Sequence, residues 1–128
     1  MKPLFAVLLA ALVTACATGA ATRPDRSGQQ NQNLIDESEI RGVSAGTALD
    51  VVHSLRPAWL LQRRPTSLMR QEGPLVVYLD GRRYGDASSL RQISASSVRT
   101  IRYYQPSEAQ ARFGPDHPQG AIEVTTVR

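Results

Sequence analysis

"LVVYLDGRRY", residues 75–84, carries the clearest structural signals in the chain. Its first five residues, Leu75 to Leu79, are apolar or aromatic without interruption, which predicts a strand buried on both faces. Asp80-Gly81 follows, and this dipeptide is the strongest short-range signal of a β-hairpin turn. The stretch therefore predicts a β-sheet with one strand in its interior.

The residues after this hairpin predict two more strands, separated by short helices. We expect a helix over 86–93, a strand over Val98–Tyr104, a helix over 106–113, a rigid loop over 115–120 and a strand over 121–127. Asp86 can cap the first helix, and Gly114 ends the second because glycine favours the position just after a helix. Ile101 and Tyr103 should share a face of their strand, since side chains alternate along it.

The residues before the hairpin predict one further helix. Thr47 and Asp50 have the spacing of a capping box, and the apolar residues of 48–55 recur at helical spacing. Pro57 should end this helix, because the residue before a proline avoids helical geometry. The segment after it, residues 58–67, is expected to bridge to the hairpin and to bury Trp59.

This alternation of helices and strands predicts a small α+β domain over residues 42–128, a mixed sheet with short covering helices. A chain of 128 residues holds one such domain at most once its first part is set aside.

The first part of the chain resembles the leader of a bacterial lipoprotein. Residues 4–13 are apolar throughout but too few to span a bilayer, as in a signal peptide. They run into "VTAC", Val13 to Cys16, which resembles a lipobox. The resemblance implies a signal peptide over 1–15 and a lipid anchor on Cys16, the only cysteine. The alternative is an ordinary signal peptidase site that happens to contain a cysteine.

Ala17 stands where an aspartate would imply retention at the inner membrane, so we expect the anchor to lie in the outer membrane. Residues 16–41 are rich in Ala, Thr, Ser, Gly, Gln and Asn, which predicts a flexible lipidated tether. A short strand or helical turn is an open alternative at the end of the tether, since this part contains Leu34, Ile35 and Ile40.

The formal net charge is +4, and the only lysine, Lys2, falls in the expected leader. The arginines are dispersed and lack the regular interleaving with aromatic residues that a single-strand binding platform requires. Together with export, this makes a nucleic-acid partner implausible, and a solvated basic face near anionic lipid is the simpler interpretation.

Four pieces of the chain, in order, resemble the plug domain of TonB-dependent outer-membrane receptors. They are "PLVVYLDGRRY", the strand "VRTI" at 98–101, the helix ending at Phe113-Gly114, and "GAIEVTT" at 120–126. The resemblance implies a plug-like fold and a partner among outer-membrane barrel or transport proteins. In the receptors the plug leads into a barrel, whereas only two residues follow Thr126, so we expect a detached plug-like domain.

The sequence offers little for catalysis. His53 and His117 are far apart, no nucleophile elbow or phosphate-binding loop is present, and no spacing of ligands suits a metal or another cofactor. Adjacent residues in a strand face opposite ways, so one of Tyr103 and Tyr104 should be buried and the other exposed. The expected contact surface is Arg102, Tyr103, Tyr104, Arg112 and His117.

The favoured function is a non-catalytic, lipid-anchored envelope protein that binds a transport component through its plug-like face or a sheet edge. The alternative is a surface lipoprotein that binds a small ligand or polysaccharide, with a pocket near residues 115–120. An enzyme would need a cluster of catalytic groups around His117.

Overall fold

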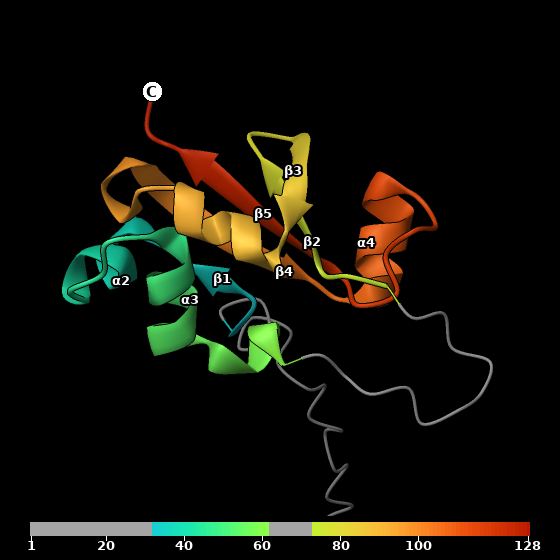
Figure 1. Cartoon of the computed structure of the whole chain (residues 1–128), viewed down its shortest axis with the longest axis horizontal. Coiled ribbons are helices and arrows are strands. Elements are labelled where there is room, and N and C mark those ends of the chain that lie inside the picture. Colours follow the sequence, from blue (N-terminus) through green and yellow to red (C-terminus); the bar gives the residue numbers. More distant parts are fainter. Residues whose placement is uncertain (1–31, 62–72) are drawn as a thin grey trace, which may run out of the picture.

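The computed structural model describes residues 32–61 and 73–128, so Cys16 and the expected leader lie outside the described residues. Five strands form one mixed sheet in the order β1-β4-β5-β2-β3 (Figure 1). They are β1 (Leu34–Ile35), β2 (Val76–Leu79), β3 (Arg82–Asp86), β4 (Val98–Tyr104) and β5 (Ala121–Thr126). β5 pairs in parallel with β2 and antiparallel with β4. The predicted fold class, a small α+β domain with a mixed sheet and short helices, is confirmed.

The hairpin at residues 80 and 81 is confirmed as well. Asp80 and Gly81 have φ values of 49° and 81°, the positive values at both central residues that a two-residue turn needs to match the strand twist. The returning strand β3 has a mostly exposed pattern and pairs antiparallel with β2, with a bulge between Val77 and Tyr78. The sequence predicts the turn, but β3 lacks the apolar alternation that would predict the strand itself.

The helices begin and end where side chains and special backbone conformations satisfy their terminal groups. They are α2 (Glu37–Gly42), α3 (Ala48–Leu55) and α4 (Pro106–Phe113), with the 3-10 segments η1 (Pro57–Leu60), η2 (Ala87–Gln92) and η3 (Ala95–Ser97). Thr47 and Asp50 form the predicted capping box of α3. Gly114 follows α4 with a φ of 105°, as expected, and Asp86 caps η2, which is a 3-10 segment in place of an α-helix.

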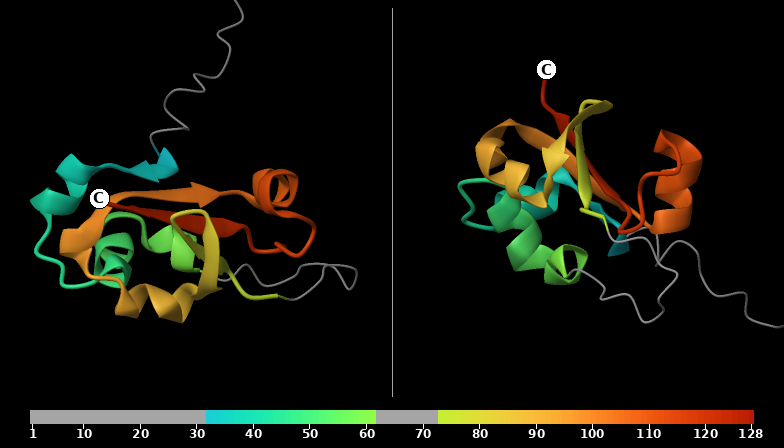
Figure 2. Two further views of the ribbon diagram at one scale, coloured as in Figure 1. Left: turned by 90° about the horizontal axis from the view of Figure 1, so that it is seen from above. Right: turned by 45° about the vertical axis from the view of Figure 1, so that its right-hand side comes forward.

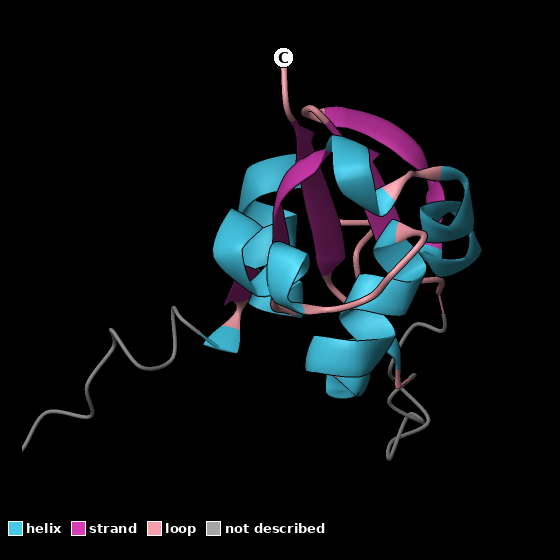
Figure 3. Ribbon diagram, turned by 90° about the vertical axis from the view of Figure 1, so that its left-hand side faces the viewer, coloured by secondary structure: helices cyan, strands magenta, loops and turns pink. Residues whose placement is uncertain are grey.

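The two faces of the sheet have separate cores. The larger core lies under α2, α3, η1 and η2 and includes Ile101, Ile122 and Val124. The smaller core lies under α4 and includes Val76, Tyr78, Tyr104 and Ala109, with Phe113 packed against it. Figure 2 shows α4 apart from the other helices, and Figure 3 shows the strands with helices on both sides. These two helical layers bury both faces of β2, as the run of apolar residues predicts.

The folded domain begins earlier than the sequence predicts. Ile35, in β1, is fully buried, and Ile40, in α2, is 6% exposed. Asp36 and Glu39 form a capping box at the start of α2. The segment that follows Gln32 is therefore part of the fold, because two isoleucines in a polar stretch suffice to cover the edge of β4; the remainder of the expected tether lies outside the described residues.

Candidate functional site

Three residues of the expected contact surface meet around one aromatic ring. The guanidinium carbons of Arg102 and Arg112 lie 5.1 Å and 5.2 Å from the centre of the Tyr104 ring. Such distances are those of cation–π contacts. The Tyr104 hydroxyl donates to Glu123 at 2.8 Å, and Arg112 pairs with the same carboxylate at 3.4 Å. The fold thus brings Arg102, Tyr104 and Arg112 together with Glu123 of β5, a residue that the sequence does not single out.

The strand register places one more arginine, Arg83 of β3, on the same face of the sheet as this cluster. Arg102 is opposite Glu123, Glu123 is beside Tyr78, and Tyr78 is opposite Arg83 on β3. Residues paired across adjacent strands lie on the same face. We call Arg83, Arg102, Arg112, Tyr104 and Glu123 the arginine face.

The prediction of one buried and one exposed tyrosine is wrong, because both faces of the sheet are covered. Tyr104 is 7% exposed under α4, and Tyr103, on the opposite face, is 9% exposed. Burial, reinforced by the hydrogen bond to Glu123, raises the pKa of the Tyr104 phenol. Tyr103 stacks on Trp59, with ring centres 5.7 Å apart, and donates its hydroxyl to the Gln119 carbonyl. Tyr103 therefore lies on the opposite face of the sheet from Arg102 and Arg112.

His117 does not belong to a contact surface either, because it is 2% exposed. Its Nδ1 is 2.8 Å from the Gly114 carbonyl, and its Nε2 is 2.9 Å from the Tyr78 hydroxyl. A carbonyl can only accept, so Nδ1 carries a proton, and in this tautomer Nε2 accepts from the Tyr78 hydroxyl. Phe113 stacks on Tyr78 with ring centres 3.9 Å apart, and its ring also lies beside that of His117, with centres 5.9 Å apart. His117 thus fastens the 115–120 loop to the sheet.

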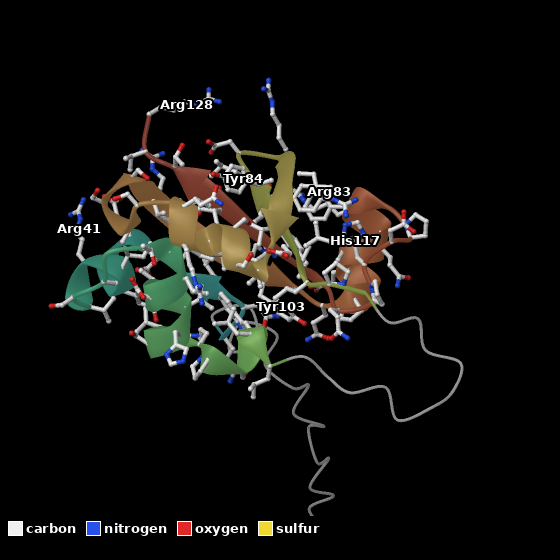
Figure 4. The ribbon with its side chains drawn as sticks, viewed as in Figure 1. Arg41, Arg83, Tyr84, Tyr103, His117 and Arg128 are labelled. Carbon is white, nitrogen blue, oxygen red and sulfur yellow. The ribbon has the colours of Figure 1, made fainter. Side chains whose placement is uncertain are left out.

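A cavity of about 370 Å³ lies on the other side of the same loop. It is bounded by the start of β1, by η1, by the end of β4 and by Gln119, with Tyr103 beside η1 in Figure 4. Its apolar lining is Ala58, Trp59, Leu60, Leu61, Leu75, Ala87 and Tyr103, and its polar lining is Gln32, Asn33, Arg56, Gln105 and Gln119. The sequence predicts the burial of Trp59 and, for the ligand-binding alternative, a pocket near residues 115–120, where Gln119 lies. It does not predict that Gln32 and Asn33 line the cavity, because they look like tether residues.

Four aspartates of the described ranges accept hydrogen bonds from backbone N–H groups. Asp80 accepts from the Thr126 N–H at 2.9 Å and from the Thr126 hydroxyl at 2.8 Å, which lowers the pKa of Asp80. Asp36, Asp50 and Asp86 cap helices, and hydrogen bonds chiefly from Ser38, Thr47 and Ser88 lower their pKa values. Within residues 32–61 and 73–128, no three His, Cys, Asp or Glu side chains gather as metal ligands would.

The charge of the described ranges bears on the expected basic face. They contain nine arginines and nine acidic residues, so their formal net charge is zero. The excess positive charge of the chain therefore comes from residues outside them. Among the helices of this part of the chain, none combines the length and apolarity needed to cross a bilayer.

In comparisons with protein-family models, curated proteins and solved structures, nothing matches this chain. The plug-like resemblance therefore depends on the sequence pieces that carry it.

Proposed function

We propose that this chain is a non-catalytic, lipid-anchored protein of the bacterial envelope that docks on a barrel or transport protein of the outer membrane. The observation that carries the proposal is "VTAC", which places Cys16 directly after an apolar leader. Two or three acyl chains hold a protein on a membrane far more firmly than one.

The chain length limits how far the domain can lie from the membrane. Fifteen residues separate Cys16 from Gln32, where the described domain begins. Even fully extended, they span no more than about 55 Å, at 3.3–3.6 Å per residue. The domain therefore meets only partners in the same membrane or close to it.

The arginine face supplies the docking surface in this proposal. Arg83 and Arg102 are exposed and form no ion pair in the described part of the chain, and the side chain of Arg112 is 54% exposed beside Glu123. Guanidinium groups pair with carboxylates through two parallel hydrogen bonds. We therefore assign an acidic segment of the partner as the group that the arginine face binds. The plug-like resemblance supports a transport component as that partner.

In-cell crosslinking, affinity purification and mass spectrometry test the proposal. The intact chain is compared with Cys16→Ala, which lacks the anchor, and with Arg102→Glu/Arg112→Glu, which keeps it. Arg91→Glu is the matched control, since Arg91 is exposed on η2, outside the arginine face. We expect the same outer-membrane protein to co-purify with the intact chain and with Arg91→Glu. It should be absent from the purifications of the other two variants. Recovery of no specific protein with the intact chain, or equal recovery with the double reversal, would contradict the proposal.

Capture of a small ligand at the cell surface is a second candidate function. The cavity beside Gln119 favours it, because its volume of about 370 Å³ is within the range of small-molecule sites. In this case as well, the anchor on Cys16 would hold the domain at the membrane.

A further inference from the structure

We propose that the cavity beside Gln119 binds a neutral saccharide of one or two rings. This inference rests on the second candidate function and is independent of docking through the arginine face. It starts from the walls of the cavity, which differ in chemistry from one side to the other.

One side of the cavity is aromatic and aliphatic. Trp59 and Tyr103 are stacked with an angle of 20° between their rings, and Leu61, at the rim, is 72% exposed. An exposed leucine beside a tryptophan is an apolar surface that a ligand can cover. The C–H-bearing face of a pyranose ring suits such a surface because it is the least polar part of the sugar.

The other side carries amide groups from Gln32, Asn33, Gln105 and Gln119. Each side-chain amide has two N–H donors and a carbonyl acceptor. A sugar hydroxyl also donates and accepts, so each hydroxyl can be satisfied by more than one of these amides.

The charge of the cavity favours a neutral ligand. Among the described residues that line it there is no carboxylate, so none of these residues would attract a cation. The charged residue among the described lining, Arg56, is paired with Glu39 at 2.9 Å and donates to the Gln32 carbonyl. This guanidinium is already neutralised, and it holds the start of β1 against the cavity.

The cavity contains its own spectroscopic probe, because Trp59 is the only tryptophan of the chain. The experiment titrates the full chain, solubilised in a mild detergent, with N,N′-diacetylchitobiose and separately with cellobiose while recording tryptophan emission. We expect at least one disaccharide to give a saturable change, with half-saturation at about 1 mM or below, equivalent to about −4 kcal/mol. No saturable change with either sugar by about 20 mM would overturn the proposal.

Variants locate the binding. Asn33→Leu/Gln119→Leu replaces two amides by leucines of similar size, and Gln110→Leu makes the same change on the exposed side of α4. Loss of two hydrogen bonds predicts binding weaker by about 5- to 150-fold for the first variant. The second variant should bind the sugar as tightly as the parent chain. Near-ultraviolet circular dichroism checks that both are folded. Equal affinity in the double variant would place the sugar elsewhere and overturn the assignment.

Sugar binding in the cavity and docking through the arginine face can be tested independently of each other. Arg102→Glu/Arg112→Glu should bind the sugar with unchanged affinity, because both arginines lie across the sheet from the cavity. Conversely, Asn33→Leu/Gln119→Leu should still recover the outer-membrane partner. Loss of sugar binding in the arginine variant would contradict the separation of the two sites.

Discussion

Gly120 is the position where a single added methyl group should do the most damage. It precedes β5 with a φ of 88°, and a Cβ built there would lie 2.3 Å from the Tyr104 carbonyl oxygen and 3.1 Å from the Tyr103 hydroxyl. Left-handed backbone costs a non-glycine residue about 1–2 kcal/mol, and overpacking a rigid neighbour costs about 1–3 kcal/mol. We therefore expect Gly120→Ala to lose about 2–5 kcal/mol of the free energy of unfolding.

Two other glycines separate these contributions. Gly114 has a φ of 105° but nothing within 4 Å of its added Cβ, so Gly114→Ala should cost only the backbone penalty, about 1–3 kcal/mol. Gly42, at the end of α2, has neither a positive φ nor a close neighbour. Gly42→Ala should be neutral or gain up to about 1 kcal/mol, through a less flexible unfolded chain.

Urea unfolding followed by Trp59 emission measures all three variants against the parent chain. The difference between Gly120→Ala and Gly114→Ala isolates the contact with Tyr104, since both positions require positive φ. If the two variants were destabilised equally, within about 0.5 kcal/mol, the loop would not be packed against β4 as described. A Gly120→Ala chain that folds should also bind the proposed saccharide more weakly, because Gln119 is displaced from the Tyr103 hydroxyl.

Other predictions concern single polar contacts. Tyr78→Phe should cost about 1–3 kcal/mol in the same urea assay, because it leaves Nε2 of the buried His117 without its donor; a change below 0.5 kcal/mol would contradict that hydrogen bond. Asp80→Asn should weaken the fold at neutral pH. Folding lowers the pKa of Asp80, so its carboxylate stabilises the folded state at pH values above the pKa it has in the unfolded chain, about 3.9. This stabilisation is lost as the pH falls through the pKa of Asp80 in the folded state. The stability difference between parent and variant should therefore be constant from pH 5 to 8 and shrink below about pH 4, and a difference independent of pH would refute this role.

The sequence predicts the elements whose local signals agree with their tertiary surroundings. The turn at Asp80-Gly81, the capping box at Thr47 and the strand Val98–Tyr104 all form where predicted. In each case a dipeptide, a cap or a run of apolar residues is a local signal that is sufficient to predict the element. The order of the strands in the sheet follows from pairing between distant segments, which no local pattern encodes.

The site was harder to predict than the fold because it depends on what covers each face. Alternation correctly places Tyr103 and Tyr104 on opposite faces, but it cannot show that α4 covers one and η1 the other. His117 occurs in a proline-flanked loop, which suggests exposure. In the structure it is buried and contacts the Tyr78 hydroxyl and the Gly114 carbonyl. The cavity combines residues from six separate segments of the chain, and the sequence points to only two of them, through Trp59 and the 115–120 loop.

The position of β5 has a consequence for the order in which the protein can be made and folded. β5 is the last described strand along the chain, yet in the sheet it lies between β4 and β2. Until residues 121–126 have left the ribosome, the other strands form two separate pairs, β1 with β4 and β2 with β3, without a shared neighbour. Pairing between distant segments is also slow to form. The sheet of the described domain therefore cannot be completed until residues 121–126 join its two halves.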